Sequence, residues 1–351
     1  MPYLTRNFEY DLPPELIAQE PAGMRGDSRL LVVDRSREVP SGCGGEPPVE
    51  DGHFRDLANL IPPGDLLVVN TSRVRHARFI GTRPSGAPAE VLLVHPATGD
   101  QWVAIGQPGT ALRPGKRIRI GPTAFIETVK VLDGGFREVR FIGMSAAEAL
   151  REIGRLPLPP YIARDPTTVD ESRYQTVYAE REGSVAAPTA GLHFTPELLA
   201  ALAARGVETA RIDLEVGPGT FKPVEVEDPA RHSMHPEWYA IPEETAAQVR
   251  SLRARGGRLW AVGTTVVRTL ESAADEEGTI QPGRAETRLL IIPGYRFRVV
   301  DRLLTNFHLP RSTLLMLVAA FGGYERIMTA YRHAVAARYR FYSYGDAMAI
   351  L

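Results

Sequence analysis

Polar residues suited to a binding site follow three predicted strands in the C-terminal half of the chain. The strands 208–216, 258–262 and 303–307 lead into Gly217-Pro218-Gly219-Thr220-Phe221, Gly263-Thr264-Thr265 and His308-Leu309-Pro310-Arg311-Ser312-Thr313. In open α/β sheets, ligands bind beyond the carboxyl ends of strands, where the next helix offers unpaired backbone N–H groups and a partial positive charge. We therefore expect a carboxylate, a phosphate or a ribose near Thr264, Thr265 and Arg268. The same residues could also be only a helix cap and a surface cation.

His193 is the first candidate for acid–base chemistry. It lies in the segment 188–195, where small residues such as Thr189 and Gly191 let the backbone approach a ligand closely. A histidine titrates near neutral pH, so it can act as a base or as a hydrogen-bond donor. A purely structural role for a single histidine stays open at this point.

A second group of titratable residues consists of His232, His235 and Glu237. Two histidines this close together could bind zinc, but a zinc site needs a third protein ligand and a fixed geometry. Pro236 interrupts any helix at this position. The spacing therefore favours general acid–base work over metal binding, and we expect no metal site.

Other polar and aromatic residues are placed to contact a substrate. Asn70 and Arg73 follow a strand expected over 65–69, and Asn306 and His308 stand at the end of the run 303–307. Tyr344 belongs to a C-terminal group of aromatic residues that could stack on a nucleobase, or could pack against the core as part of a strand. No fingerprint of dinucleotide binding, of a phosphate-binding P-loop or of a nucleophile elbow is present. The residues alone thus indicate an α/β enzyme with a polar cleft at its strand ends.

The elements that must position these residues follow from the apolar periodicity. From residue 185 onward, strands and helices alternate, which predicts a layered α/β domain. Strands are expected over 29–34, 65–69, 208–216, 258–262, 288–292 and 303–307, and helices over 11–18, 196–205, 243–255, 266–274, 313–321 and 325–339. Thr195 and Pro196 form a strong helix start, and Gly206 a stop.

The segment 74–154 has a different character. Short runs of alternating apolar and polar residues are separated by Pro-Gly and Asp-Gly-Gly turns: 89–95, 102–105, 117–120, 124–132 and 138–142. This spacing predicts a small antiparallel barrel or sandwich. The fold class is therefore predicted as α/β, with a layered α/β main domain formed by 1–73 and 155–351 and an inserted small antiparallel β-barrel domain at 74–154.

Composition narrows the class of protein. The 351 residues are 44% apolar and 24% charged and carry a net charge of −1, so no global positive field favours a polyanion. A local basic patch stays open, because 41 Lys and Arg residues are available to cluster. The single cysteine, Cys43, excludes an internal disulfide and a cysteine-based zinc site. No signal-like or membrane-spanning apolar run is present, so we expect a cytoplasmic protein without membrane contact.

Taken together and in order, these segments resemble one family. The match is carried by residues 8–19, 70–73, 156–162, 174–178, 187–195, 217–221, 263–271, 305–316 and 339–348. The pattern is similar to the S-adenosylmethionine:tRNA ribosyltransferase-isomerase family of queuosine biosynthesis, and it extends over nearly the full chain.

The resemblance implies a reaction. The ribosyl moiety of S-adenosylmethionine is transferred to 7-aminomethyl-7-deazaguanine at the wobble position of tRNA and isomerised, giving epoxyqueuosine with release of adenine and methionine. S-adenosylmethionine is then a co-substrate, with no bound cofactor and no metal. The macromolecular partner is the tRNA anticodon loop that carries this base, and we expect the enzyme to be a monomer.

The same resemblance gives the candidates hypothetical roles. The reaction needs a base for the ribose 5′ proton, which the sulfonium acidifies, and an acid for adenine. The residues expected to supply them are His193, His232, His235 and Glu237.

The remaining candidates are expected to bind the substrates. Thr264, Thr265 and Arg268 would hold the methionine carboxylate, and Asn70 and Arg73 would contact ribose or tRNA phosphate. The cleft would be lined further by Thr189, Gly191, Gly217, Gly219, Asn306, His308 and Tyr344.

One position departs from the family pattern. A histidine is expected immediately before Val216 and Gly217, whereas this chain has Glu215. If that histidine matters to the family, its role passes here to Glu215 or to another residue.

Two other functions remain as alternatives. An S-adenosylmethionine-dependent RNA methyltransferase would release S-adenosylhomocysteine, but the chain lacks its glycine-rich first βα loop. In a non-catalytic RNA-binding module the cleft would be incidental. Clustered Thr, His, Asn and Arg at three strand ends exceed what binding needs, and the net charge of −1 suits such a module poorly.

Overall fold

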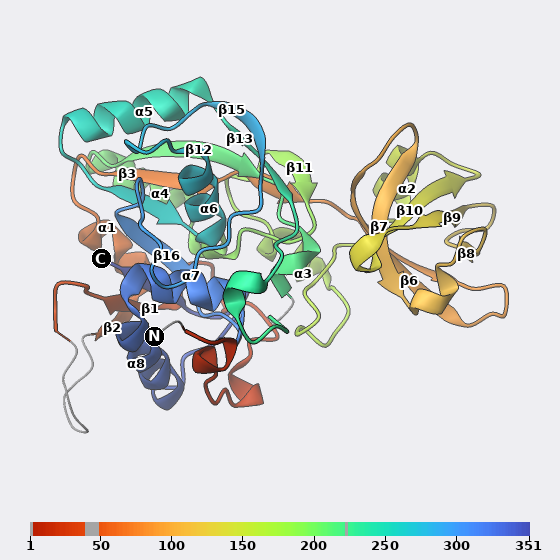
Figure 1. Cartoon of the computed structure of the whole chain (residues 1–351), viewed down its shortest axis with the longest axis horizontal. Coiled ribbons are helices and arrows are strands. Elements are labelled where there is room, and N and C mark those ends of the chain that lie inside the picture. The colour runs from red at the N-terminus through yellow and green to blue at the C-terminus, as the bar shows by residue number, and fades with distance from the viewer. Residues whose placement is uncertain (1–2, 39–48, 222–223) are drawn as a thin grey trace.

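A mixed sheet runs through the main body of the molecule. The computed structural model describes residues 3–38, 49–221 and 224–351. Within these residues nine strands form the sheet, in the order β15 (Gly283–Thr287), β13 (Glu237–Ile241), β12 (Glu208–Leu214), β3 (Leu66–Asn70), β14 (Leu259–Val262), β16 (Arg302–Asn306), β17 (Ala347–Ile350), β1 (Arg29–Val33) and β2 (Val49–His53). Helices lie on both faces of this sheet (Figure 1). The predicted mixed α/β class is confirmed.

The four central strands, β12, β3, β14 and β16, are parallel to one another. Every residue of β3 and β14 is buried, as is usual for parallel strands covered on both faces. The carboxyl ends of the four strands therefore meet at one edge of the sheet. Their last residues are Leu214, Asn70, Val262 and Asn306. The polar loops that the sequence predicts to form a site all leave the sheet at this edge.

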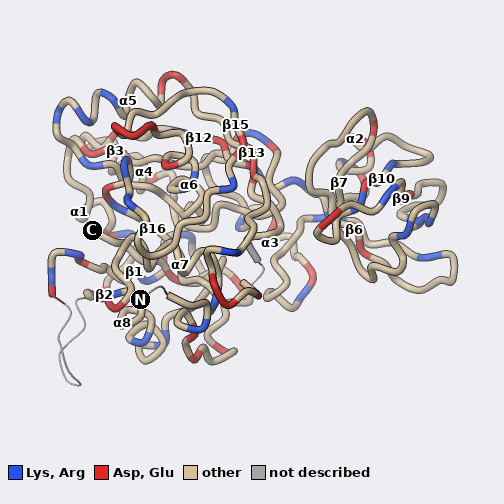
Figure 2. The backbone as a smooth tube through the Cα atoms, in the orientation of Figure 1, with Lys and Arg blue, Asp and Glu red and all other residues tan. Residues whose placement is uncertain are grey.

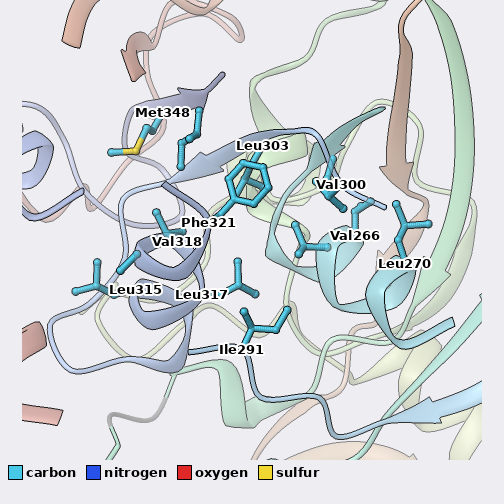
Figure 3. Close-up of a cluster of buried hydrophobic side chains, with 14 of the residues drawn as sticks. Val266, Leu270, Ile291, Val300, Leu303, Leu315, Leu317, Val318, Phe321 and Met348 are labelled. Carbon is cyan, nitrogen blue, oxygen red and sulfur yellow. The ribbon is translucent and has the colours of Figure 1, made fainter. Parts of the chain in front are cut away.

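Two apolar layers hold the helices against the sheet. On one face, α5 (Glu243–Ala254), α6 (Thr264–Ala273), α7 (Thr313–Gly322) and α8 (Tyr324–Ala336) enclose a core that includes Leu270, Leu303 and Val318 (Figure 3). On the other face, α1 (Leu57–Leu60) and α4 (Pro196–Ala204) cover Trp260. Burying one large apolar side chain stabilises a fold by about 1.5–3 kcal/mol, so both layers fix the strand ends firmly.

A second set of strands lies beside this body. The stretch 78–142, all of it described, closes into a six-stranded antiparallel barrel in the order β10 (Arg137–Ile142), β7 (Gln101–Gln107), β6 (Pro88–Pro96), β5 (Arg78–Thr82), β8 (Arg117–Arg119) and β9 (Phe125–Val131). Phe79, Val91, Ile118 and Ile126 are buried in its interior. The helix α2 (Ala146–Glu152) follows, and β8 and β9 lie on the side of the barrel away from the sheet (Figure 1).

The connection between the barrel and the body is short. The strands β4 (Ser72–Val74) and β11 (Arg181–Ser184) pair in parallel on the body side, and α3 (Thr168–Arg173) lies close by. A small apolar cluster that includes Val74, Leu156 and Ile162 fills the junction. The division of the chain into two domains at residues 74 and 154 stays a prediction.

Several local predictions are wrong. Residues 11–18 contain only a 3₁₀ turn at Pro14–Leu16, and Pro13 before it is not helical (φ −56°, ψ 128°), because a residue that precedes proline is disfavoured in the helical region. No strand occupies 288–292; the edge strand is β15 at Gly283–Thr287. The strands β5, β13 and β17 are not predicted at all. Cys43 lies outside the described residues.

The length and apolar character of the helices bear on whether any of them could span a membrane. Among the residues that the structure describes, no helix combines the length and the apolar character that crossing a bilayer requires.

A buried carboxylate fixes the entry into β16. Glu271 of α6 is 3% exposed and accepts hydrogen bonds from the backbone N–H groups of Arg298 (2.9 Å), Val299 (3.0 Å) and Val300 (3.1 Å). A charge this deeply buried is tolerated only when it is fully hydrogen-bonded. Because residues 298–300 precede β16, Glu271 helps to position the polar end of that strand.

We expect Glu271→Ala to destabilise the fold by about 3 kcal/mol, because it leaves three backbone N–H groups, those of Val299 and Val300 buried and that of Arg298 partly buried, without their acceptor, at about 1 kcal/mol each. The free energy of unfolding in urea measures the effect. Glu277→Ala removes an exposed carboxylate a short distance away and should change stability by less than about 0.5 kcal/mol. Equal effects of the two substitutions would contradict the role of Glu271.

Candidate active site

The edge where the parallel strands end contains a pocket. Five of the predicted residues line it: Thr189, Thr264, Thr265, Asn306 and His308. Helices α6 and α7 both begin there, after Gly263 and Ser312, and Gly263 has a φ of 92° that only glycine adopts easily. Each helix N-terminus presents unpaired N–H groups and about half a positive charge. The pocket is therefore suited to a carboxylate or another anionic group.

Asn306, the last residue of β16, has its amide orientation fixed by its surroundings. Its Nδ2 lies 3.0 Å from the carbonyl oxygen of Tyr342 and 3.5 Å from that of Asp346. Carbonyl oxygens only accept hydrogen bonds, so the NH₂ group must face them. The Oδ1 atom then points the other way, where it is buried without a hydrogen-bond partner among the described residues. An unsatisfied buried acceptor costs about 1–3 kcal/mol, so this atom is poised to accept a hydrogen bond from a ligand.

The same network determines the protonation of His193. The Nδ2 of Asn306 lies 3.1 Å from Nε2 of His193, so Nε2 must accept and the proton lies on Nδ1, which donates to Ser28 Oγ at 2.6 Å. Burial, reinforced by the charge of Arg25, lowers the pKa of His193 to about 3. His193 stands behind Asn306 and is not among the residues that line the pocket. It holds Asn306 and has no free nitrogen for a substrate.

His308 does face the pocket. Its Nε2 lies 2.8 Å from the hydroxyl of Thr305, and its backbone N–H donates to Tyr331. Burial lowers the pKa of His308 to about 3, so the ring is neutral at physiological pH. The pocket therefore has polar walls with little charge.

The backbone beside Asn306 is strained. Tyr342 has a φ of 71°, a region that bulky residues adopt rarely and at a cost of about 1–3 kcal/mol. Its carbonyl is the group that orients Asn306, and its ring lies against that of Tyr161 with centroids 4.6 Å apart. Strain of this kind persists where the surroundings enforce it, often at functional sites.

A buried ion pair lies next to the pocket. Arg268 and Glu237 are 4% and 6% exposed and form a salt bridge. The other oxygen of Glu237 accepts from the backbone N–H of Gly217 at 2.9 Å, and Nε of Arg268 donates to the carbonyl of Leu289 at 3.0 Å. These contacts connect α6 with β13 and with Gly217, the first residue of the glycine loop 217–221. Only Nη2 of Arg268 has no partner among the described residues.

Four predicted residues join this pair around a small cavity: Gly217, Gly219, His232 and His235. Burial, and then the neighbouring His235, lower the pKa of His232. The cavity shares Leu314 with the main pocket, so the two are adjacent. His308 and Arg268 thus line adjacent pockets, and His193 contacts Asn306 of the main pocket.

A cleft continues from this cavity toward the barrel. Gly217 and His235 also border an apolar pocket of about 450 Å³, whose far wall contains Phe136 of the barrel. The rings of Phe136 and His235 are 5.2 Å apart and nearly perpendicular, at 83°. Pro218 connects this pocket with a second one of about 630 Å³. The cleft therefore runs from the strand ends to the junction with the barrel.

The other predicted residues lie outside the main pocket. The side-chain amide of Asn70 donates to the carbonyl of Leu214 and accepts from its N–H, both at 3.0 Å, and so extends the pairing between β3 and β12. Arg73 donates to the carbonyl of Ala179. Gly191 is packed so closely that a Cβ atom would lie 2.2 Å from the Tyr178 hydroxyl. The hydroxyl of Tyr344 donates to the buried Asp170. These contacts are structural, and a substrate role for the four residues stays a prediction.

Glu215, at the position that departs from the family pattern, also lies outside. It faces Arg284, with a closest distance of 3.3 Å, and none of the described pockets includes it.

Four further lining residues are not among the candidate site residues: Tyr161, Ser312, Tyr342 and Ser343, although Ser312 lies in the polar loop after 303–307 and Tyr342 in the C-terminal aromatic group. The hydroxyls of Tyr161 and Ser343 are 2.6 Å apart, and Ser312 accepts from the N–H of Leu315 as the cap of α7. All four fall in segments that carry the family resemblance. The signal was therefore present at the level of segments, but not of individual side chains.

The main pocket is narrow. The space open to water inside it is about 60 Å³, which is room for a few water molecules at about 10–15 Å³ each. A nucleoside-sized ligand therefore requires its walls to move apart. Within residues 3–38, 49–221 and 224–351, no group of three His, Cys, Asp or Glu residues is placed to hold a metal ion.

Comparison with known proteins gives one consistent result. A family model described as "Queuosine biosynthesis protein" matches residues 5–350. The S-adenosylmethionine:tRNA ribosyltransferase-isomerase of Symbiobacterium thermophilum is 53% identical over 348 residues, covering 98% of this chain and 99% of that protein. The protein of the same name from Syntrophomonas wolfei is 50% identical, covering 99% and 97%. A crystal structure of S-adenosylmethionine tRNA ribosyltransferase from Thermotoga maritima has 37% identity, a TM-score of 0.55 and coverage of 98% and 100%.

The buried neutral histidines predict how stability depends on pH. With its pKa lowered to about 3 in the folded state, His193 binds fewer protons there than in the unfolded chain, where its pKa is about 6.5. Its contribution is therefore complete above pH 6.5 and is lost as the pH falls toward 3, at about 1.4 kcal/mol per pH unit. Urea unfolding at several pH values measures this slope. His193→Gln should reduce this slope by about 1.4 kcal/mol per pH unit, the amount that corresponds to one proton. An unchanged slope would contradict the neutral state assigned to His193.

Proposed function

Because the chain belongs to the S-adenosylmethionine:tRNA ribosyltransferase-isomerase family, a family of transferases in queuosine biosynthesis, we propose that it modifies tRNA. It transfers and isomerises the ribosyl moiety of S-adenosylmethionine onto 7-aminomethyl-7-deazaguanine at the wobble position. The product is epoxyqueuosine, and adenine and methionine leave. One observation carries the proposal: two helix N-termini, the free Oδ1 of Asn306 and the hydroxyl of Thr265 converge on one pocket.

The methionine carboxylate is the group that suits the helix ends. The hydroxyl of Thr265 is buried there without a partner among the described residues, so it is free to donate to this carboxylate. Arg268 is less suited to the task than the sequence suggests, because Glu237 and Leu289 engage most of its donors. We therefore assign the carboxylate to Thr265 and the starts of α6 and α7. Arg268 acts through Glu237 by positioning Gly217.

The neutrality of the pocket suits the co-substrate. S-adenosylmethionine carries a fixed positive charge on its sulfur, and a protonated histidine nearby would repel it. Burial keeps His193 and His308 neutral by lowering the pKa of each to about 3. The free Oδ1 of Asn306 is a suitable acceptor for a hydroxyl or ammonium group of the same molecule.

The acid–base roles fall to the residues around the small cavity. His193 has both nitrogens engaged, and Glu237 is committed to Arg268 and Gly217. We assign His193 and Glu237 as positioning residues. We assign the removal of the ribose 5′ proton and the protonation of adenine to His232 and His235, because both border the small cavity and His235 also borders the apolar pocket through which the tRNA base would enter.

The barrel is proposed to be a separate domain, inserted at residues 74–154 between the two parts of the main domain. In this arrangement the cleft admits the anticodon loop from the side of Phe136 and Pro218. The enzyme would work in the cytoplasm, where its tRNA substrate is found, and as a monomer.

The reaction itself tests the proposal. Incubation with S-adenosylmethionine labelled in the ribose, together with tRNA that bears the deazaguanine precursor, should transfer the label to the nucleoside and release adenine and methionine in equal amounts. Release of S-adenosylhomocysteine would favour a methyltransferase instead. Binding of tRNA without release of any product would favour the RNA-binding module.

Thr265→Val tests the carboxylate site, because valine keeps the shape of threonine and removes its hydroxyl. Loss of one hydrogen bond to a charged group costs about 1.5–3 kcal/mol, so the KM for S-adenosylmethionine should rise about 10- to 100-fold while the KM for tRNA is unchanged. Thr209→Val, at an exposed position on β12, is the matched control and should have no effect. A normal KM in the Thr265 variant would remove this residue from the site.

A further inference from the structure

The charge of this chain is unevenly distributed. The barrel segment 78–142 contains nine Lys and Arg residues against five Asp and Glu, a net charge of +4, whereas the rest of the chain contains 32 against 37, a net charge of −5. The overall charge of −1 is thus the sum of a positive barrel segment and a negative remainder of the chain. In Figure 2 the Lys and Arg positions gather along β8, β9 and β10, whereas the body mixes both signs.

Three arginines lie on the outer surface of these strands. Arg117 and Arg119 alternate on β8 with the buried Ile118, so both point outward. Arg140 stands on β10, two strands away, and Glu127 of β9 lies between it and Arg117 in the strand register. We name Arg117, Arg119 and Arg140 the arginine face.

Two of these guanidinium groups are held in place. Glu127 is 7% exposed; one of its oxygens accepts from Nε of Arg117 at 2.7 Å and the other from Nε of Arg140 at 3.0 Å. The two arginine side chains cover this carboxylate, yet each remains 54% exposed. A guanidinium group that is already oriented loses less entropy when it binds a phosphate than a free side chain does.

Three further cations of this region, Arg113, Lys116 and Arg119, have no carboxylate partner among the described residues, whereas Lys130 pairs with Glu138 at 2.8 Å. Within the stretch 49–221, all of it described, no carboxylate forms a salt bridge with Arg119, Arg113 or Lys116, and all three are exposed. Arg119 lies over the ring of Phe125, 5.7 Å from its centroid. Between residues 113 and 140 there are seven Lys and Arg residues and three Asp and Glu residues, which leaves an excess of positive charge on this side of the barrel.

We propose that the arginine face binds the phosphate backbone of an RNA stem. The inference rests on the proposed function, in which the reacting base of tRNA occupies the cleft between body and barrel. The face lies on β8–β10, and β8 and β9 are on the side of the barrel away from the sheet (Figure 1). RNA that reaches both places must extend beyond its loop, so the contact falls on the helical stem. Arginine contacts to phosphates carry no sequence information, hence the face adds affinity without choosing among tRNAs.

Arg119→Glu tests the proposal without breaking a salt bridge. We measure the Kd for full-length tRNA by fluorescence anisotropy without S-adenosylmethionine, so that the result is independent of catalysis. The Kd should rise about fivefold to tenfold, and the slope of log Kd against log salt concentration should fall by about one, as for one lost phosphate contact. With a hairpin cut back to the anticodon loop and its closing base pairs, Kd should not change.

Arg140→Gln provides a second variant, milder because it removes a charge without reversing it. Arg250→Glu is the matched control, because Arg250 is an exposed arginine of α5 on the negative body. An equal loss in the Arg250 variant, a loss that persists with the truncated hairpin, or an unchanged Kd for full-length tRNA in both barrel variants would each overturn the proposal. If the wild type bound tRNA through this face but released no adenine, the proposed reaction would fail and the RNA surface would stand.

Discussion

The site depends on a simple rule of hydrogen bonding: a carbonyl oxygen only accepts. The carbonyls of Tyr342 and Asp346 therefore force the NH₂ group of Asn306 to face them, and this in turn decides which nitrogen of His193 carries the proton. The acceptor that Asn306 presents to the pocket follows from this chain of constraints. The free Oδ1 of Asn306 and the position of the proton on His193 are two consequences of one arrangement, and the strained backbone of Tyr342 lies beside it.

This arrangement also explains why segments far apart in the sequence must fold together. Ser28, His193, Asn306 and Tyr342 come from four separate parts of the chain, and each satisfies a polar group of the next. Removing any one would leave a buried donor or acceptor unpaired, at about 1–3 kcal/mol. The buried pair of Arg268 and Glu237 does the same for the glycine loop. In both cases a hydrogen-bonded polar network in an apolar environment holds the side chains in one conformation.

The sequence predicts the parts of this structure that depend on local pattern. Continuous apolar runs indicate the buried parallel strands β3, β14 and β16, and cap residues locate α4, where Thr195 accepts from Leu198 as expected. Because parallel strands end at one edge, the convergence of their polar loops could also be foreseen. The edge strand β15 and the short β17 could not, since their pairing depends on partners distant in the chain. Likewise the role of His193 could not be read from its residue type, because Asn306 and burial decide its protonation.

The distribution of charge connects the two ends of the molecule. Under the proposed function the enzyme binds two substrates of opposite charge, a cationic sulfonium and a polyanionic RNA. A uniformly basic protein would attract the RNA and repel the sulfonium. Here the barrel is net positive, the body is net negative, and burial keeps His193 and His308 neutral by lowering the pKa of each. A net charge near zero, which by itself argues against nucleic acid, is then the sum of two surfaces that each suit one substrate.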